Sequence, residues 1–322
     1  LLGREAGGLM WAGAFVRILM EVFKLFLLLI FSTYAIILLS ILVRRFIGKK
    51  LSKPDPEDSK PRGCGDRTDF PLIEVINAKK AFDHPVLRGI TLSVNCGEVL
   101  GVLGKSGTGK SVLLKLLAGF LKPDSGLILF NGVDLAHMRE DDLLEIRKRV
   151  SYVFQSGAFF DFLNVRENIA YPLRERGMLS EDEIEDRVEY LLDEVELDGM
   201  GDFRYDELGT GAKKQVAIAR SIAINPDVIL YDEPTTGVDP IIGKSLSRLI
   251  RKLGEKESLT SVVVTHDLKC LEIVSDRIVL LKDGHIQFQG TATQFQQSED
   301  AFVEAFRSGK RFEETPHDQY PA

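Results

Sequence analysis

Eight consecutive residues beginning at Gly104 are suited to holding the phosphates of a nucleotide. They read Gly-Lys-Ser-Gly-Thr-Gly-Lys-Ser and match the pattern G-x-x-x-x-G-K-[ST]. The glycines let neighbouring backbone N–H groups converge on phosphate oxygens, and the start of a helix adds its dipole. We expect Lys110 to reach the β- and γ-phosphates and Ser111 to ligate Mg²⁺. The residues predicted to bind nucleotide here are Gly104, Lys105, Ser106, Gly107, Thr108, Gly109, Lys110 and Ser111.

Two adjacent carboxylates form the second candidate site. Asp232 and Glu233 follow the apolar run Val-Ile-Leu-Tyr at residues 228–231, which is typical of a buried parallel strand. Such a pair on its own is more often a solvated strand end. Together with a phosphate-binding loop it predicts nucleotide hydrolysis. Asp232 would hold Mg²⁺, directly or through water, and Glu233 would act as the general base or orient the attacking water.

The elements that must position these residues follow from the apolar patterning. Residues 98–103 (EVLGVL) are expected to form a strand directly before the loop, and residues 112–121 (VLLKLLAGFL) an apolar helix directly after it. Further along the chain, Ser180 and Glu183 have the spacing of a capping box. Apolar residues follow them at helical intervals: Ile184, Val188, Leu191, Leu192 and Val195. Strands and helices of these kinds indicate an α/β protein.

With four further residues, these elements resemble the ATPase subunit of ABC transporters over residues 71–309. Phe82 lies where the family stacks an aromatic ring on adenine, and Gln155, in YVFQSGAFF, matches the glutamine that senses Mg²⁺ and contacts the membrane subunit. Asp239, in TTGVDP, matches the residue that crosses to the other monomer. His266, in VVVTHD, matches the histidine near the γ-phosphate. A lone glutamine or histidine is more often structural, but here the elements occur in the family's order and spacing.

The resemblance implies a fold, two cofactors and a set of site residues. The implied fold is that of a P-loop NTPase, with a RecA-like core, a helical subdomain over about residues 156–215 and an antiparallel β part. The cofactors are ATP and Mg²⁺, and two ATPase subunits, expected to be identical, are needed to complete each nucleotide site. The implied catalytic residues are Lys110, Gln155, Glu233 and His266, and the implied Mg²⁺ ligands are Ser111, Gln155 and Asp232.

One segment narrows the resemblance to a subfamily. Residues 154–161 (FQSGAFFD), 163–168 (LNVREN) and 170–175 (AYPLRE) look like the Mla-type ATPases of lipid transport. Other ABC importers share the FQ and ENV pieces of the family pattern but seldom combine SGA with PLRE. The partners implied by this similarity are a permease of the MlaE type and an Mce-domain protein that binds lipid outside the membrane.

The chain departs from the family at the signature segment. Family members carry Leu-Ser-Gly-Gly before the helix that faces the partner's ATP, whereas this chain has Leu-Gly-Thr-Gly at residues 208–211. Gly209 therefore replaces the serine whose hydroxyl reaches the γ-phosphate. Thr210 supplies a hydroxyl one position later, and Gly211 is retained. We expect a weakened site rather than an abolished one, because the backbone N–H groups and the helix dipole remain.

The N-terminal residues suggest a membrane segment. Residues 25–43 (LFLLLIFSTYAIILLSILV) contain no charge and are long enough to span a bilayer as a helix. Residues 44–53 carry five basic residues and no acidic ones, which predicts a cytoplasmic location for this end. A signal peptide and a buried soluble helix are the disfavoured alternatives. We expect a membrane segment over 1–50, a linker over 51–70, the ATPase domain over 71–309 and a C-terminal tail over 310–322.

The function expected from the sequence is ATP hydrolysis that drives a separate permease at the bacterial inner membrane, with phospholipid as cargo. Two alternatives remain open: an ABC ATPase for another cargo, such as amino acids, metals or lipoproteins, and a nucleotide-gated regulatory subunit with weak hydrolysis. The 322 residues carry a net charge of −7, and the basic residues do not gather into one domain-wide patch. Nucleic acid is therefore not an expected partner.

Overall fold

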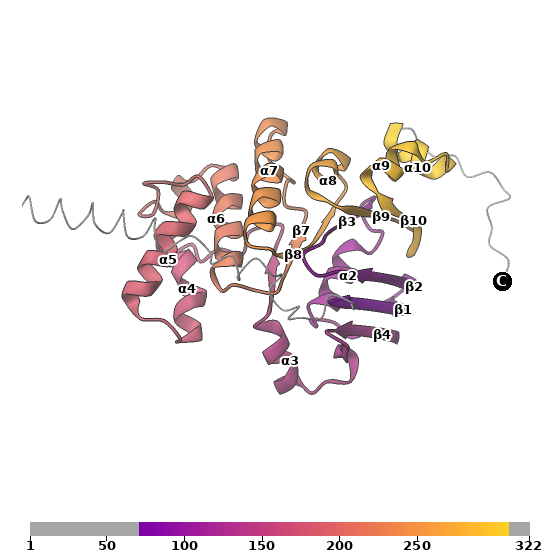
Figure 1. Cartoon of the computed structure of the whole chain (residues 1–322), viewed down its shortest axis with the longest axis horizontal. Coiled ribbons are helices and arrows are strands. Elements are labelled where there is room, and N and C mark those ends of the chain that lie inside the picture. The colour runs from indigo at the N-terminus through magenta and orange to yellow at the C-terminus, as the bar shows by residue number, and fades with distance from the viewer. Residues whose placement is uncertain (1–70, 309–322) are drawn as a thin grey trace, which may run out of the picture. The chain divides into compact units, whose positions relative to one another are not determined.

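The computed structural model describes residues 71–308, which form two β-sheets with helices around them (Figure 1). The predicted span at 25–43, the predicted linker at 51–70 and the predicted tail at 310–322 lie outside the described residues. Between residues 71 and 308, no helix combines the length and the hydropathy that crossing a bilayer requires.

The larger sheet has six strands in the order β10-β9-β3-β8-β7-β6. Five of them run parallel, and β10 pairs antiparallel with β9 at the edge. The strands are β3 (Val99–Gly104), β6 (Val150–Val153), β7 (Val228–Asp232), β8 (Thr260–Thr265), β9 (Arg277–Lys282) and β10 (His285–Thr291). Strands β3, β7 and β8 are buried along their whole length, as expected for central parallel strands that are covered on both faces.

The smaller sheet has four strands in the order β2-β1-β4-β5, all paired antiparallel. They are β1 (Ile73–Ala81), β2 (Pro85–Val94), β4 (Ser125–Phe130) and β5 (Val133–Asp134). In the central strand β1, Ile73 pairs with Val94 of β2 on one side and with Phe130 of β4 on the other. Val75 and Ala78 point into a core shared with residues of the larger sheet and of helix α2.

Helices follow most strands of the larger sheet. They are α2 (Lys110–Leu117), α3 (Glu140–Arg147), α4 (Val165–Arg176), α5 (Glu181–Glu194), α6 (Thr210–Ala223), α7 (Pro240–Lys256), α8 (Leu268–Val274), α9 (Ala292–Gln297) and α10 (Ala301–Ser308), with short 3₁₀ turns η2 (Leu135–His137) and η3 (Tyr205–Glu207). Helix α2 follows β3 after the phosphate-binding loop, which confirms the predicted order of strand, loop and helix. The helix spans Lys110–Leu117, so it ends four residues before the predicted 121; Gly119, with φ 66°, follows its C-cap.

Helices α4, α5 and α6 lie between β6 and β7 in the chain. They pack against one another (Figure 1). The predicted start of α5 is confirmed: the Ser180 side chain accepts a hydrogen bond from the Glu183 backbone, and the Glu183 carboxylate accepts one from the Ser180 backbone. The apolar residues after them, including Val188 and Leu191, are buried in the core that these three helices share.

Candidate active site

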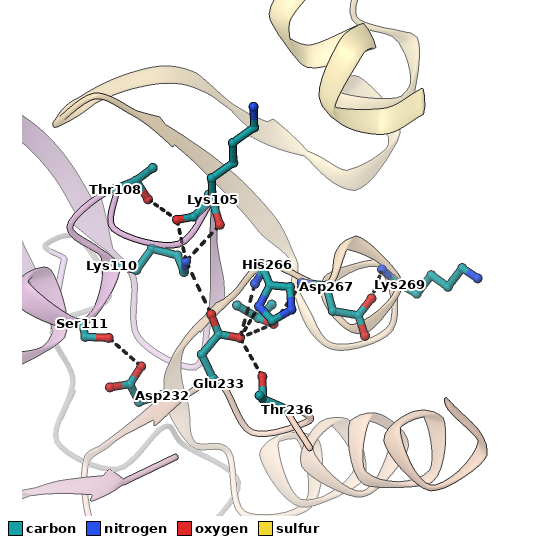
Figure 2. Close-up of polar contacts among 12 residues, drawn as sticks. Lys105, Thr108, Lys110, Ser111, Asp232, Glu233, Thr236, His266, Asp267 and Lys269 are labelled. Carbon is teal, nitrogen blue, oxygen red and sulfur yellow. Dashed lines mark hydrogen bonds and ion pairs between the residues drawn. The ribbon is translucent and has the colours of Figure 1, made fainter. Parts of the chain in front are cut away.

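Three neighbouring parallel strands bring the predicted site residues to one edge of the larger sheet. The phosphate-binding loop follows β3, His266 follows β8, and Asp232 and Glu233 lie at the end of β7. Because β3, β8 and β7 are adjacent and parallel, their carboxyl ends meet, and the side chains converge (Figure 2). The loop, Glu233 and His266 line one cavity of about 790 Å³.

The loop is held around the buried side chain of Lys110. Its Nζ donates hydrogen bonds to the carbonyls of Gly104 (2.9 Å) and Lys105 (3.0 Å) and lies 3.4 Å from Glu233 Oε1. Gly109 has φ 97°, and a Cβ there would lie 2.7 Å from a Leu87 methyl group, so this position requires glycine. The side chain of Lys105 extends away from Glu233 (Figure 2).

The remaining loop residues complete the turn. Thr108 Oγ1 donates to the carbonyl of Lys105 at 2.9 Å, and Gly107 has φ 82°. Lys105, Ser106, Gly107, Gly109, Lys110 and Ser111 all border the cavity. Backbone N–H groups at the start of α2 have no carbonyl partner within the helix, so they are free to face an anion.

Asp232 accepts hydrogen bonds on both carboxylate oxygens. Oδ1 accepts from Ser111 Oγ at 2.9 Å, and Oδ2 accepts from the Tyr152 hydroxyl at 2.8 Å. Burial, followed by this contact with Asp232, raises the pKa of Tyr152, so the phenol keeps its proton and remains a donor.

The donor set beside the loop suits Mg²⁺. Ser111 and Asp232 offer a hydroxyl and a carboxylate, which are hard oxygen ligands of the kind that Mg²⁺ prefers. Within residues 71–308 there is no cluster of three or more His, Cys, Asp and Glu side chains that could hold a metal ion alone.

Glu233 is enclosed on several sides. Its side chain is 12% exposed, and Oε2 accepts hydrogen bonds from Thr236 Oγ1 (3.0 Å) and Thr265 Oγ1 (3.1 Å) and lies 2.8 Å from His266 Nδ1 (Figure 2). Burial alone would raise the pKa of this carboxyl. The charges of His266 and Lys110 and the two hydroxyl donors outweigh burial and lower the pKa, so Glu233 is held in the ionised form that a general base requires.

The backbone of Glu233 adopts an uncommon conformation. Its φ of 50° lies in the left-handed region, which non-glycine residues adopt at a cost of about 1–3 kcal/mol. The Glu233 N–H donates to the carbonyl of Val264 in the neighbouring strand at 2.9 Å. This bond and the contacts of the carboxylate hold the residue in place against the strain.

Phe82 and Gln155 reach the same cavity from two other elements. Phe82 follows β1, its ring is 57% exposed, and Lys80 Nζ lies 5.7 Å from the ring centroid. Gln155 follows β6 and is exposed. Its backbone carbonyl accepts a hydrogen bond from Lys214 Nζ at 2.6 Å. The structure thus gathers Phe82, Gln155, Glu233, His266 and the phosphate-binding loop around one space.

The signature segment and Asp239 do not belong to that space. Gly209, Thr210, Gly211 and Asp239 line a second cavity of about 380 Å³, which shares no lining residue with the first. Gly209 is the N-cap of α6, with φ −68°, and a Cβ added there would meet no atom within 4 Å. Asp239 caps α7, where its Oδ1 accepts from the N–H groups at positions 241 (2.9 Å) and 242 (3.1 Å).

Several contacts of the site were not expected from the sequence. Tyr152 lies three residues before Gln155, and Thr265 directly precedes His266, so proximity to predicted residues was the available signal. Thr236 and Lys214 gave no signal of their own. Ala305 and Phe306 of α10 also border the larger cavity, although this helix lies about 70 residues beyond Glu233 and its sequence carries no nucleotide-binding motif.

Comparison with known proteins assigns the chain to a family. Residues 87–236 match the family model described as "ABC transporter". The intermembrane phospholipid transport system ATP-binding protein MlaF of Haemophilus influenzae is 39% identical over 240 residues, which are 74% of this chain and 91% of that protein. The sulfate/thiosulfate import ATP-binding protein CysA of Synechocystis is 39% identical over 237 residues, which are 73% of this chain and 65% of that protein.

A solved structure agrees with these sequence relatives. It is a dimeric ATP-binding cassette in a post-hydrolysis state, bound to ADP and Pi. It matches with a TM-score of 0.63 and 30% identity, and the match covers 69% of this chain and 99% of that one. The chain therefore belongs to the ABC transporter family, as an ATP-binding and ATP-hydrolysing subunit.

Proposed function

We propose that the chain is the ATPase subunit of a membrane transporter for phospholipid. The observation that carries the ATPase part is the convergence of Lys110, Ser111, Asp232, Glu233 and His266 on one cavity. The cargo part is supported by the similarity to the phospholipid-transport ATPase and by the segment over residues 154–175. The sulfate/thiosulfate relative has the same 39% identity to this chain, but the match covers a smaller share of that relative (65% against 91%). Another cargo is therefore the second candidate.

Residues of this chain would hold the phosphates and Mg²⁺ and would accept the proton of the attacking water. Lys110 and the loop N–H groups would hold the β- and γ-phosphates. Ser111 and Asp232, with Gln155, would hold Mg²⁺, which when bound neutralises charge on the phosphate oxygens. The Glu233 carboxylate would accept a proton from the attacking water as the new O–P bond forms and the bond to the leaving ADP breaks. His266, hydrogen-bonded to Glu233, would stay beside the γ-phosphate.

The separation of the two cavities supports a dimer. The phosphate-binding loop lines one cavity, whereas Gly209, Thr210, Gly211 and Asp239 line the other. We propose that two copies pack so that the signature segment and Asp239 of one cover the nucleotide bound to the other. ATP would close this pair, and hydrolysis would release it.

An aromatic surface whose first residue lies five positions after Gln155 in the chain supports contact with a permease. Phe160 lies 4.5 Å from Tyr171 and 5.8 Å from Phe162 between ring centroids, and Phe162 is 70% exposed. Exposed aromatic groups of this kind are typical of protein interfaces. We propose that this surface, defined by Phe160, Phe162 and Tyr171, receives a segment of an MlaE-type permease that works with an Mce-domain lipid-binding protein.

The N-terminal span at 25–43 remains a prediction, and we propose that it tethers the ATPase to the inner membrane with the catalytic domain on the cytoplasmic side. A variant without residues 1–50 tests the tether. Weaker membrane association is expected, because only the proposed contact with the permease remains, and unchanged association and transport would make the tether dispensable.

The Glu233→Gln variant of the full-length chain tests the ATPase. We expect kcat to fall by about 10²–10⁴-fold, because a general base is lost, while nucleotide binding is retained. Phosphate release and binding of a fluorescent ATP analogue are the measurements. A wild-type chain whose slow turnover is unchanged by the substitution would instead be the nucleotide-gated regulatory subunit.

A pull-down of the full-length chain from native membranes in mild detergent tests the cargo, with mass spectrometry of bound proteins and lipids. Recovery of a multi-span permease, an Mce-domain protein and phospholipid is expected. Recovery of a permease with a solute-binding protein and no enriched lipid would keep the ATPase and overturn the cargo.

A further inference from the structure

Helix α6 holds the loop that carries Gln155 through two long cationic side chains. Lys214 Nζ donates to the backbone carbonyl of Gln155 at 2.6 Å. Arg220, almost two turns further along the helix, donates from Nη1 to the carbonyl of Ala158 (2.6 Å) and from Nη2 to that of Gly157 (2.7 Å). One helix therefore binds three of the four carbonyl groups of residues 155–158.

Lys214 is buried and Arg220 is partly buried, which makes the contacts unusual. Lys214 is only 7% exposed, and no carboxylate of the described residues lies within ion-pair distance of its Nζ. Arg220 likewise has no ion pair within that part of the chain, and its guanidinium carbon lies 5.6 Å from the centroid of the Phe159 ring. Burying a cation is costly unless hydrogen bonds replace its water, and here the carbonyls of the loop replace it.

The loop between residues 155 and 158 needs to be held. Gly157 has φ 82° and Ala158 has φ 47°, two consecutive left-handed residues, and the second is not glycine. A Cβ at Gly157 would lie 2.5 Å from the Phe159 ring. Strained backbone of this kind persists only where surrounding contacts determine it. Arg220 supplies two such contacts at the strained residues themselves.

The far end of the loop is attached to the same group of helices. Asn168 of α4 accepts a hydrogen bond from the Phe160 N–H and donates one to the Phe160 carbonyl, both at 3.1 Å. Helix α4 in turn packs against α6. The near end of the loop continues β6, in the sheet that carries the phosphate-binding loop. The loop thus joins the sheet to the helix that Gly209 caps.

We propose that Lys214 and Arg220 are positioning residues that make Gln155 follow the movement of α6. The proposal rests on the proposed function, in which Gln155 acts at the nucleotide. Because α6 begins at the signature segment, a shift of that segment against a second copy displaces the carbonyls bound by Lys214 and Arg220. The Gln155 side chain is carried into or out of the cavity with them.

A double-mutant cycle on the full-length chain tests the coupling. Lys214→Met keeps the unbranched apolar part of the side chain and removes the donor, and we expect it to lower kcat about tenfold. In a Gln155→Ala background the same substitution should have little further effect, because the side chain it positions is gone. Lys214→Arg, which restores a donor, should recover much of the activity.

Lys213→Met is the matched control. Lys213 is the neighbouring residue on α6, but its Nζ lies 4.0 Å from the Tyr205 ring centroid and makes no hydrogen bond to residues 155–158 in the described structure. This variant should retain wild-type kcat. If Lys214→Met does not fold, Arg220→Lys, which loses the two-carbonyl contact, replaces it in the same cycle.

Two results would overturn the inference. One is a Lys214→Met variant as active as the Lys213→Met control. The other is a loss of activity that is equally large in the Gln155→Ala background, which would mark Lys214 as structural only. Failure of the proposed function is distinguishable, because the wild-type chain would then show no turnover that depends on Glu233.

Discussion

At the scale of single residues, Gly209 sets the signature segment apart from its family. The backbone there, at φ −68° and ψ 162°, is open to any L-residue, and no atom lies within 4 Å of a Cβ placed on it. Glycine is therefore not required by sterics, in contrast to Gly109 in the phosphate-binding loop. The missing hydroxyl is a chemical difference that a single substitution can reverse.

We expect Gly209→Ser to raise kcat by about tenfold to a hundredfold, provided that the hydroxyl contact forms in the transition state. A hydrogen bond to a charged group is worth about 1.5–3 kcal/mol, and about 1.4 kcal/mol corresponds to tenfold in rate. Phosphate release by the purified full-length chain is the measurement. Gly209→Ala, which also fits but adds no hydroxyl, is the control, and equal rates for the two variants would refute this explanation.

At the scale of elements, Asp239 has a structural role in addition to the one that the family resemblance implies: it caps a helix. Its carboxylate caps α7, a seventeen-residue helix that packs against α6 and α8 and buries residues of the main core. A loss of activity on mutation of Asp239 would therefore be ambiguous, because a lost cap and a lost contact to a second copy both reduce it.

Two substitutions at Asp239 separate these roles. Asp239→Ala removes the cap and should lower the free energy of unfolding by about 0.5–2 kcal/mol. Asp239→Asn keeps an acceptor that caps nearly as well, so the melting temperature should stay close to that of the wild type. A fall in kcat for Asp239→Asn at unchanged melting temperature would locate the role of the charge outside the helix cap. An equal loss of stability in both variants would contradict the assignment of the cap to the acceptor oxygen.

The elements also show what the sequence could and could not predict. Strand β3, the loop and helix α2 were predictable because the motif and its flanking elements are contiguous, and the start of α5 was predictable because a capping box is local. The hydrogen bond from Tyr152 to Asp232 joins residues 80 positions apart on adjacent strands, so only the strand order reveals it. From the sequence, Lys214 would be expected to be an exposed lysine on a helix. It is buried because α6 packs beside β6, and the sequence alone does not predict that packing.

At the scale of the whole molecule, the separation of the two cavities bears on how ATP would regulate assembly in the proposed dimer. A nucleotide in the larger cavity would present its γ-phosphate beside Glu233 and His266. The signature segment of the same chain does not line this cavity. In the proposed dimer, a second copy supplies that segment over the nucleotide bound in this cavity.

We therefore expect the full-length Glu233→Gln variant to dimerise with Mg²⁺ and ATP in mild detergent and to be less associated with ADP. The substitution blocks hydrolysis, so the closed state accumulates. Light scattering coupled to size-exclusion chromatography measures the mass in each state. A dimer that is equally populated with ATP, with ADP and without nucleotide would show that association is not driven by the γ-phosphate.

The two cavities also have a genetic consequence. In a two-fold symmetric pair each copy gives its loop to one site and its signature segment to the other, so one defective copy impairs a shared assembly. If defective and normal copies are made in equal amounts and pair at random, about three-quarters of all pairs contain at least one defective copy. A Glu233→Gln allele should accordingly be dominant in a cell that still carries the wild-type gene, whereas a deletion allele should be recessive.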